Sequence, residues 1–159
     1  MEQRTLVQWL KILVIFAAVC GVGICVGALP PMGRSFVDKY PELSYCYWPW
    51  LLFLWVLAVP CFMALVLAWK VFTNIEKDNS FCMENAEYLK KFSYLAAWDS
   101  AVLFVGNAVY LLLGMNHPSI FLTCILVMFA GIAIAVASAC LSHLIRKAAL
   151  LQEESDLTI

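Results

Sequence analysis

Apolar residues form four long blocks along this chain, and polar residues gather in short stretches between them. The blocks cover approximately residues 12–29, 50–72, 92–113 and 119–144. A helix needs about 20 apolar residues to cross a hydrocarbon layer of ~30 Å. The pattern therefore predicts four transmembrane helices in a single integral membrane domain, residues 1–159, with a polar connection at 73–91 between the second and third helices.

Composition strengthens this interpretation. The chain is 64% hydrophobic and only 13% charged, and a soluble domain has too little interior to bury so many apolar side chains. The formal net charge of -1 gives no basic field that would attract nucleic acid directly. We expect an all-α, polytopic membrane protein with four helices in a bundle, surrounded by the lipid bilayer.

Basic residues beside the spans predict the orientation. Eight of the ten lie beside one membrane face, namely Arg4, Lys11, Lys70, Lys77, Lys90, Lys91, Arg146 and Lys147, and the other face has Arg34 and Lys39. Positive residues favour the cytoplasmic side. Both termini and the connection 73–91 are therefore expected in the cytoplasm, in a multi-pass protein of the cell membrane.

Prolines mark two expected interruptions. Pro30 and Pro31 follow the first apolar block and are expected to end its helix. Pro60 lies inside the second block, predicts a kink there, and leaves the carbonyl of Val56 without its usual donor. Asn107 of the third span should lie near that level, so we expect its amide to bond to the carbonyl of Val56.

The connection 73–91 has the most distinctive polar chemistry of the chain. A turn-prone stretch is followed by strong helix formers, so a helix is expected to begin near Cys82, with Glu87 and Lys91 paired one turn apart. As the longest charged connection, and one expected in the cytoplasm, it is a candidate surface for a soluble partner. The candidate docking residues are Asn79, Phe81, Glu84, Asn85, Glu87, Lys90 and Lys91.

Three short motifs carry a resemblance: Asn79-Ser80-Phe81, Glu84-Asn85-Ala86 and Leu89-Lys90-Lys91. They resemble a bacterial family of small four-helix membrane proteins of unknown function, often encoded beside a small helix-turn-helix regulator of the Cro/C1 type. The resemblance implies a bacterial inner-membrane protein and suggests that regulator as the partner. A serine is more usual in that family where this chain has Cys82, a poor helix cap, so the cap is expected to pass to Ser80.

Asp99 is the strongest single signal for an intramembrane site. If the membrane boundary is at Phe92, Asp99 lies about 10 Å inside it. Inserting an acid at that depth costs at least ~2.5 kcal/mol of free energy. Helix ends place it level with Cys61 or Phe62 and with Ile134, none of them basic. Three interpretations stay open: a protonated acid bonded to backbone or to Ser100, a site for a proton, amine or basic partner helix, or an acid kept near water by bilayer thinning.

Small and polar residues also predict how the helices pack. Ser93, Ser100, Asn107 and Gly114 recur every seven residues, which favours an interhelical seam over a polar pathway. The ridge at Gly131, Ala135 and Ala139 predicts another close contact, either inside the protein or in a homodimer.

No sequence motif points to catalysis. The chain lacks H-E-x-x-H, G-x-S-x-G and phosphate-loop patterns, and its seven cysteines have no C-x-x-C spacing. We therefore expect no enzyme activity, cofactor or metal. The favoured function is a membrane regulator or sensor that docks a cytoplasmic partner through residues 70–91. The alternatives are a small transporter or channel subunit that uses Asp99, and a structural protein that binds another membrane protein.

Overall fold

The computed structural model describes residues 3–156, which are helical apart from short connections. The elements are α1 (Gln3–Val22), the π-helix η1 (Gly23–Ala28), α2 (Leu29–Lys39), the 3-10 helix η2 (Pro41–Cys46), α3 (Tyr47–Glu76), α4 (Met83–Leu112) and α5 (Pro118–Asp156). Four stretches are long and apolar enough to cross a membrane: Thr5–Lys39, Pro41–Glu76, Met83–Leu112 and Pro118–Ser155. The predicted all-helical fold with four spans is confirmed.

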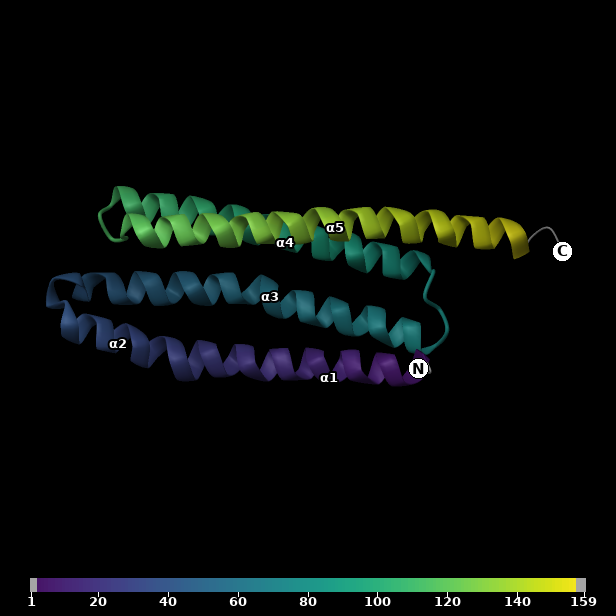
Figure 1. Cartoon of the computed structure of the whole chain (residues 1–159), viewed down its shortest axis with the longest axis horizontal. Coiled ribbons are helices and arrows are strands. Elements are labelled where there is room, and N and C mark those ends of the chain that lie inside the picture. Colours follow the sequence, from purple (N-terminus) through teal and green to yellow (C-terminus); the bar gives the residue numbers. More distant parts are fainter. Residues whose placement is uncertain (1–2, 157–159) are drawn as a thin grey trace.

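The long helices run side by side with alternating directions (Figure 1). The starts of α1 and α4 and the ends of α3 and α5 lie together at one end of the molecule, which we call the terminal end. The opposite end, which we call the far end, contains η2 and the turn between α4 and α5. α5 extends beyond the other helices at the terminal end.

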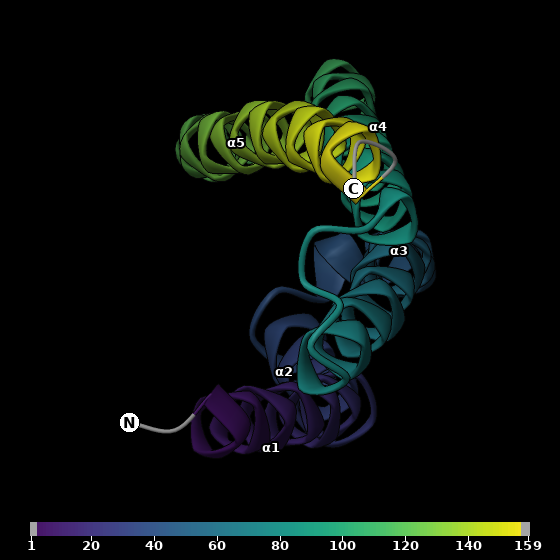
Figure 2. The ribbon, with the colours of Figure 1, turned by 90° about the vertical axis from the view of Figure 1, so that its right-hand side faces the viewer.

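The four-helix bundle is open. Within the described residues, α1 packs on α3, α3 on α4 and α4 on α5, with no close backbone contact between α1 and α4 or α5, or between α3 and α5. Seen along the helices, the row bends into an arc with one concave side (Figure 2). α4 packs against both α3 and α5 and therefore joins the pair α1 and α3 to α5.

The first span does not end at Pro30 and Pro31 as predicted. The chain stays helical to Lys39: it widens to a π-helix before the prolines, and both prolines lie in the first turn of α2. Leu29 N–H bonds to the Ile24 carbonyl five residues earlier. The next carbonyl in this pattern, that of Cys25, would need a donor from Pro30 and instead accepts from Trp55 Nε1 at 3.0 Å.

An aromatic cluster joins α3 to α4 at the far end. The ring centroid of Tyr110 lies 5.2 Å from that of Trp50 and 5.3 Å from that of Phe53. The Tyr110 hydroxyl donates to the Pro49 carbonyl at 2.9 Å, and Trp50 Nε1 donates to the Met115 carbonyl at 3.2 Å. Amphipathic rings at this depth match the boundary expected for the membrane surface. α3 itself continues through Pro60 and changes direction near its middle (Figure 1).

The contact between α4 and α5 depends on small residues. A Cβ atom at Gly131 would overlap the Ser100 hydroxyl, so the two backbones approach more closely than larger side chains would allow. Ala135 is buried on the same face, one turn further along. Near the terminal end the Ser142 hydroxyl donates to the Ala86 carbonyl at 2.6 Å. The ridge predicted at Gly131 and Ala135 therefore packs inside the protein.

Loss of the Trp55 donor should weaken the contact between η1 and α3. We expect Trp55→Phe to lower the free energy of unfolding by about 1–3 kcal/mol, because the Cys25 carbonyl loses its partner inside hydrocarbon. Pro30→Ala restores a backbone donor, so the same Trp55→Phe change should cost much less in that background. Thermal unfolding of the four proteins in detergent measures this, and an equal cost in both backgrounds would contradict it.

A second pair of variants tests the seam between α4 and α5. Gly131→Ala should lower the free energy of unfolding by about 1–3 kcal/mol, because its methyl group overlaps the Ser100 hydroxyl. Ser100→Ala removes that hydroxyl and leaves the Ser100 Cβ at an ordinary 3.5 Å, so the double variant should regain most of the loss. Thermal unfolding in detergent is again the measurement, and a double variant as unstable as Gly131→Ala would refute this account.

Candidate functional site

A hydrogen-bond network at the terminal end fixes the connection between α3 and α4. Asn85 has no exposed surface and uses its whole side-chain amide. Its Oδ1 accepts from Asn74 Nδ2 at 2.9 Å, and its Nδ2 donates to the carbonyls of Asn79 at 3.2 Å and Ser80 at 3.0 Å. Asp78, between Asn74 and Asn79 in the chain, has a left-handed backbone conformation with φ 59°. One amide therefore holds both sides of the turn together.

The start of α4 differs from the expected cap. α4 begins at Met83, close to the predicted position, and its N-cap residue is Cys82 in an extended conformation. Neither Cys82 nor Ser80 caps the helix through its side chain; the Ser80 carbonyl instead accepts from Asn85. Asn85 lies inside the first turn, so a residue of the helix itself fastens the preceding turn.

The predicted docking residues separate into two groups. Asn85 is buried, so its prediction as a docking residue is wrong, and its amide serves the connection instead. The other six have exposed side chains: Asn79, Phe81, Glu84, Glu87, Lys90 and Lys91. Glu87 Oε1 lies 4.0 Å from Lys91 Nζ, which confirms the predicted pair. The network of Asn85 thus holds an exposed, mostly charged surface in place.

α5 adds a second element at this end. Ser142 bonds to Ala86, which sets the level of α5 against the first turn of α4. Because a helix rises about 1.5 Å per residue, Asp156 lies roughly 16 Å beyond the start of α4. Ala149, buried in this extension, is level with the connection 77–82. The exposed residues of the connection and of the first turns of α4, and the projecting end of α5, all lie at the terminal end of the molecule; we call this region the terminal surface.

Asp99 lies between α3 and α4, inside the membrane-spanning region. Its Oδ2 is 3.8 Å from Cys61 Sγ, which agrees with the prediction that Asp99 is level with Cys61 or Phe62. Its Oδ1 is buried and has no hydrogen-bond partner among the described residues. A thiol is a weak donor, so the carboxyl group lacks a strong partner from its own chain.

The other two predicted intramembrane residues serve packing. Ser100 donates to the Ala96 carbonyl at 2.8 Å and faces Gly131. Asn107 is fully buried, donates to the Leu103 carbonyl at 2.9 Å and accepts from Asn116 Nδ2 at 3.0 Å. The predicted bond from Asn107 to the Val56 carbonyl is therefore wrong, because a carbonyl of its own helix and the following turn use its amide.

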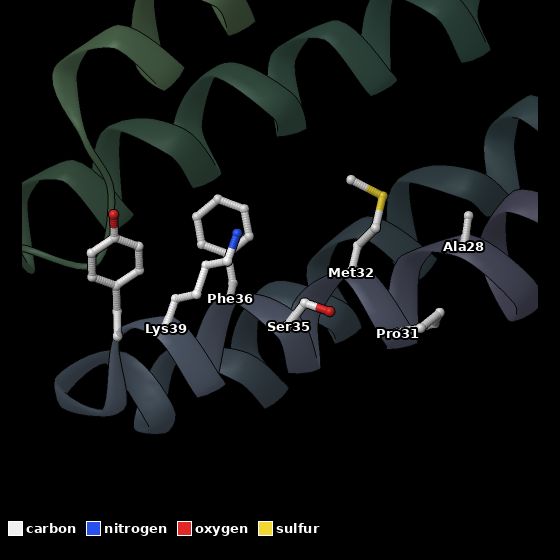
Figure 3. A pocket seen from close by; sticks show the side chains of 7 residues that line it. Ala28, Pro31, Met32, Ser35, Phe36 and Lys39 are labelled. Carbon is white, nitrogen blue, oxygen red and sulfur yellow. The ribbon is translucent and has the colours of Figure 1, made fainter.

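A hollow at the far end has a different character. It has a volume of about 510 Å³ and lies along one face of α2, with Ala28, Pro31, Met32, Ser35, Phe36, Lys39 and Tyr40 as its lining (Figure 3). The side chains spread along the helix in Figure 3 without converging on a common point. Among the described residues no three His, Cys, Asp or Glu side chains lie close enough to share a metal ion. This face has the form of an open helix surface.

Sequence reasoning did not select Asn74 as a site residue. Its partner Asn85 was selected, but as a docking residue. A signal was available, because one asparagine precedes the turn-prone stretch and another follows it, and each can bond to backbone across a turn.

The network of Asn85 predicts a sharp difference between neighbouring asparagines. Asn85→Ala should lower the free energy of unfolding by about 2–3 kcal/mol and speed proteolysis within residues 77–82, because the Asn79 and Ser80 carbonyls and the Asn74 amide lose partners. Asn79→Ala is the control; its side chain is exposed and only its backbone takes part, so we expect a change within ~0.5 kcal/mol. Equal effects of the two variants would contradict the network.

Comparison with known proteins agrees with this architecture. Over 153 residues the chain is 27% identical to the uncharacterized membrane protein YoaS of Bacillus subtilis (strain 168), and the match covers 95% of this chain and 96% of that protein. No solved structure matches the chain. Residues 32–159 match the family described as "Protein of unknown function (DUF2975)". This match covers well over half of the sequence, and the chain therefore belongs to the DUF2975 family.

Proposed function

We propose that this membrane protein is a regulator that holds a soluble cytoplasmic partner on its terminal surface. The observation that carries the proposal is the complete burial of Asn85 beneath exposed charged neighbours. A surface fixed before binding loses less conformational entropy when a partner docks.

The charge distribution supports a cytoplasmic position for this surface. Seven basic residues with described side chains lie toward the terminal end: Lys11, Lys70, Lys77, Lys90, Lys91, Arg146 and Lys147. Toward the far end are Arg34 and Lys39. Positive residues favour the cytoplasmic face of a membrane protein, so this orientation makes the terminal surface accessible to soluble proteins.

The chemistry of the terminal surface suits a protein partner. Glu84, Glu87, Lys90 and Lys91 present both signs of charge, and Phe81 is 57% exposed beside them. An aromatic residue at the centre with a polar rim around it is the usual arrangement of a protein–protein interface. The resemblance to a family often encoded beside a helix-turn-helix regulator makes a small DNA-binding regulator our candidate partner.

The alternative function, a transporter or channel subunit, has support from Asp99 alone. A transport path needs further polar groups along its length. At the level of Asp99 the described polar neighbour is Cys61, while Ser100 and Asn107 bond to carbonyls of their own helix. Docking therefore has the stronger support.

Photo-crosslinking from the terminal surface tests the proposal. With p-benzoylphenylalanine at position 87 in the native membrane, we expect a crosslink to a small soluble regulator, identified by mass spectrometry. Glu84→Lys together with Lys91→Glu should reduce this crosslink at least tenfold, because it exchanges the charges that the partner meets. Absence of a soluble partner, or a crosslink unaffected by the exchange, would refute the proposal.

The far end supplies the matched control. Arg34→Glu with Asp38→Lys exchanges the same number of charges on exposed α2 side chains and should leave the crosslink from position 87 unchanged. Equal loss in both variants would indicate a general effect on the protein and contradict a docking role for the terminal surface.

A further inference from the structure

Asp99 and Cys61 both lie on the concave side of the helix arc. Asp99 meets Cys61 of α3, and the next residue, Ser100, packs on Gly131 of α5. Successive helical residues are about 100° apart, so the Asp99 side chain lies in the sector of α4 between its two neighbours. Likewise, Cys61 meets α4, and Phe62 packs on Gly21 of α1. These sectors are smaller than 180° and face the concave side seen in Figure 2.

The α5 part of this concave face is apolar and unpartnered. On the side away from the concave face, α4 and α5 form a groove. Ala101 and Val105 of α4 line it together with Ile132 and Val136, which mark one flank of α5. Val127, Ile134 and Leu141 lie on the opposite flank and are 56%, 50% and 48% exposed. They therefore line the concave face, with Ile134 close to the level of Asp99.

The concave face has room for one helix. α3 and α5 lie about 100° apart around α4, and packed helices have axes 8–10 Å apart. A helix placed at this distance from both α3 and α5 would have its axis roughly 12 Å from that of α4. Such a spacing leaves space for one long side chain to bridge the guest helix and Asp99.

Among the side chains that the structure describes, no basic one reaches that position. The nearest on α4, Lys91, lies about 12 Å closer to the terminal end, and Lys11 and Lys70 also lie toward that end. A second copy in the same orientation brings its bases to the same levels and leaves Asp99 unpaired. A basic group that pairs with the Asp99 carboxyl group would therefore have to come from a different protein.

We propose that the concave face binds a transmembrane helix of another membrane protein, which places a lysine, arginine or histidine against Asp99. The guest helix packs against α3 and α5, and its base pairs with the carboxyl group that Cys61 serves only weakly. Asp99 thereby selects the guest helix, and the apolar residues around it provide the contact area.

Two crosslinking positions on α5 test this interaction. Ile134 and Val136 are apolar, similarly exposed at 50% and 58%, and only two residues apart, but they lie on opposite flanks of α5. With p-benzoylphenylalanine at position 134 in the native membrane we expect a crosslink to a membrane protein at least tenfold stronger than from position 136. A product with the mass of two copies of this chain, equal yields at both positions, or no product from position 134 would overturn the proposal.

The charge of Asp99 provides the decisive variants. Asp99→Asn keeps the size of the side chain and should reduce the crosslink from position 134 at least tenfold, whereas Asp99→Glu should retain most of it. The sequence of the crosslinked helix must contain a base at the level of Asp99. Asp99→Lys combined with an aspartate at that base should restore the crosslink. Persistence of the crosslink in Asp99→Asn, or failure of the exchange to restore it, would overturn the proposal independently of any result from position 87.

Discussion

A backbone carbonyl inside hydrocarbon has no water to bond to, and this constraint determines how the helices meet. Beside Pro30 and in the turn after α4, where the helical ladder is interrupted, a side chain from another helix supplies the donor. Trp55 serves the Cys25 carbonyl beside Pro30, and Trp50 serves the Met115 carbonyl in the turn after α4. The breaks in one helix thus fix the position and rotation of its neighbour.

α4 combines the two sites proposed for this protein. Its first two turns carry the exposed charges of the terminal surface, and Asp99 lies about 18 Å further along the same uninterrupted helix, measured from Glu87. Asn85 fastens the beginning of α4 to the connection, and Ser100 fixes its middle against α5. A change of packing at Asp99 therefore has a rigid element through which to reach the terminal surface.

Hydropathy was enough to predict the four spans, and helix-end alignment placed Asp99 level with Cys61. The arc of helices could not be predicted from the sequence. A residue that faces lipid and a residue that faces a neighbouring helix are both apolar, so the hydropathy pattern does not distinguish them. Asn107 shows a second limit: its amide bonds to the carbonyl four residues earlier, which is always within reach, in preference to a distant one. Asn85 shows a third, since a polar residue in a connection can be exposed for a partner or buried to hold the turn, and its residue type is the same in both cases.

The length of α5 has an electrostatic consequence. Its 39 residues span roughly 58 Å, about twice the thickness of a hydrocarbon core. If the core ends at the level of Phe92, close to Ser138 of α5, Asp156 lies roughly 20 Å beyond the lipid headgroups, further than the Debye length of about 8 Å at physiological ionic strength. A protein held near Asp156 therefore responds to the charges of α5 itself, while anionic lipids contribute little to its binding.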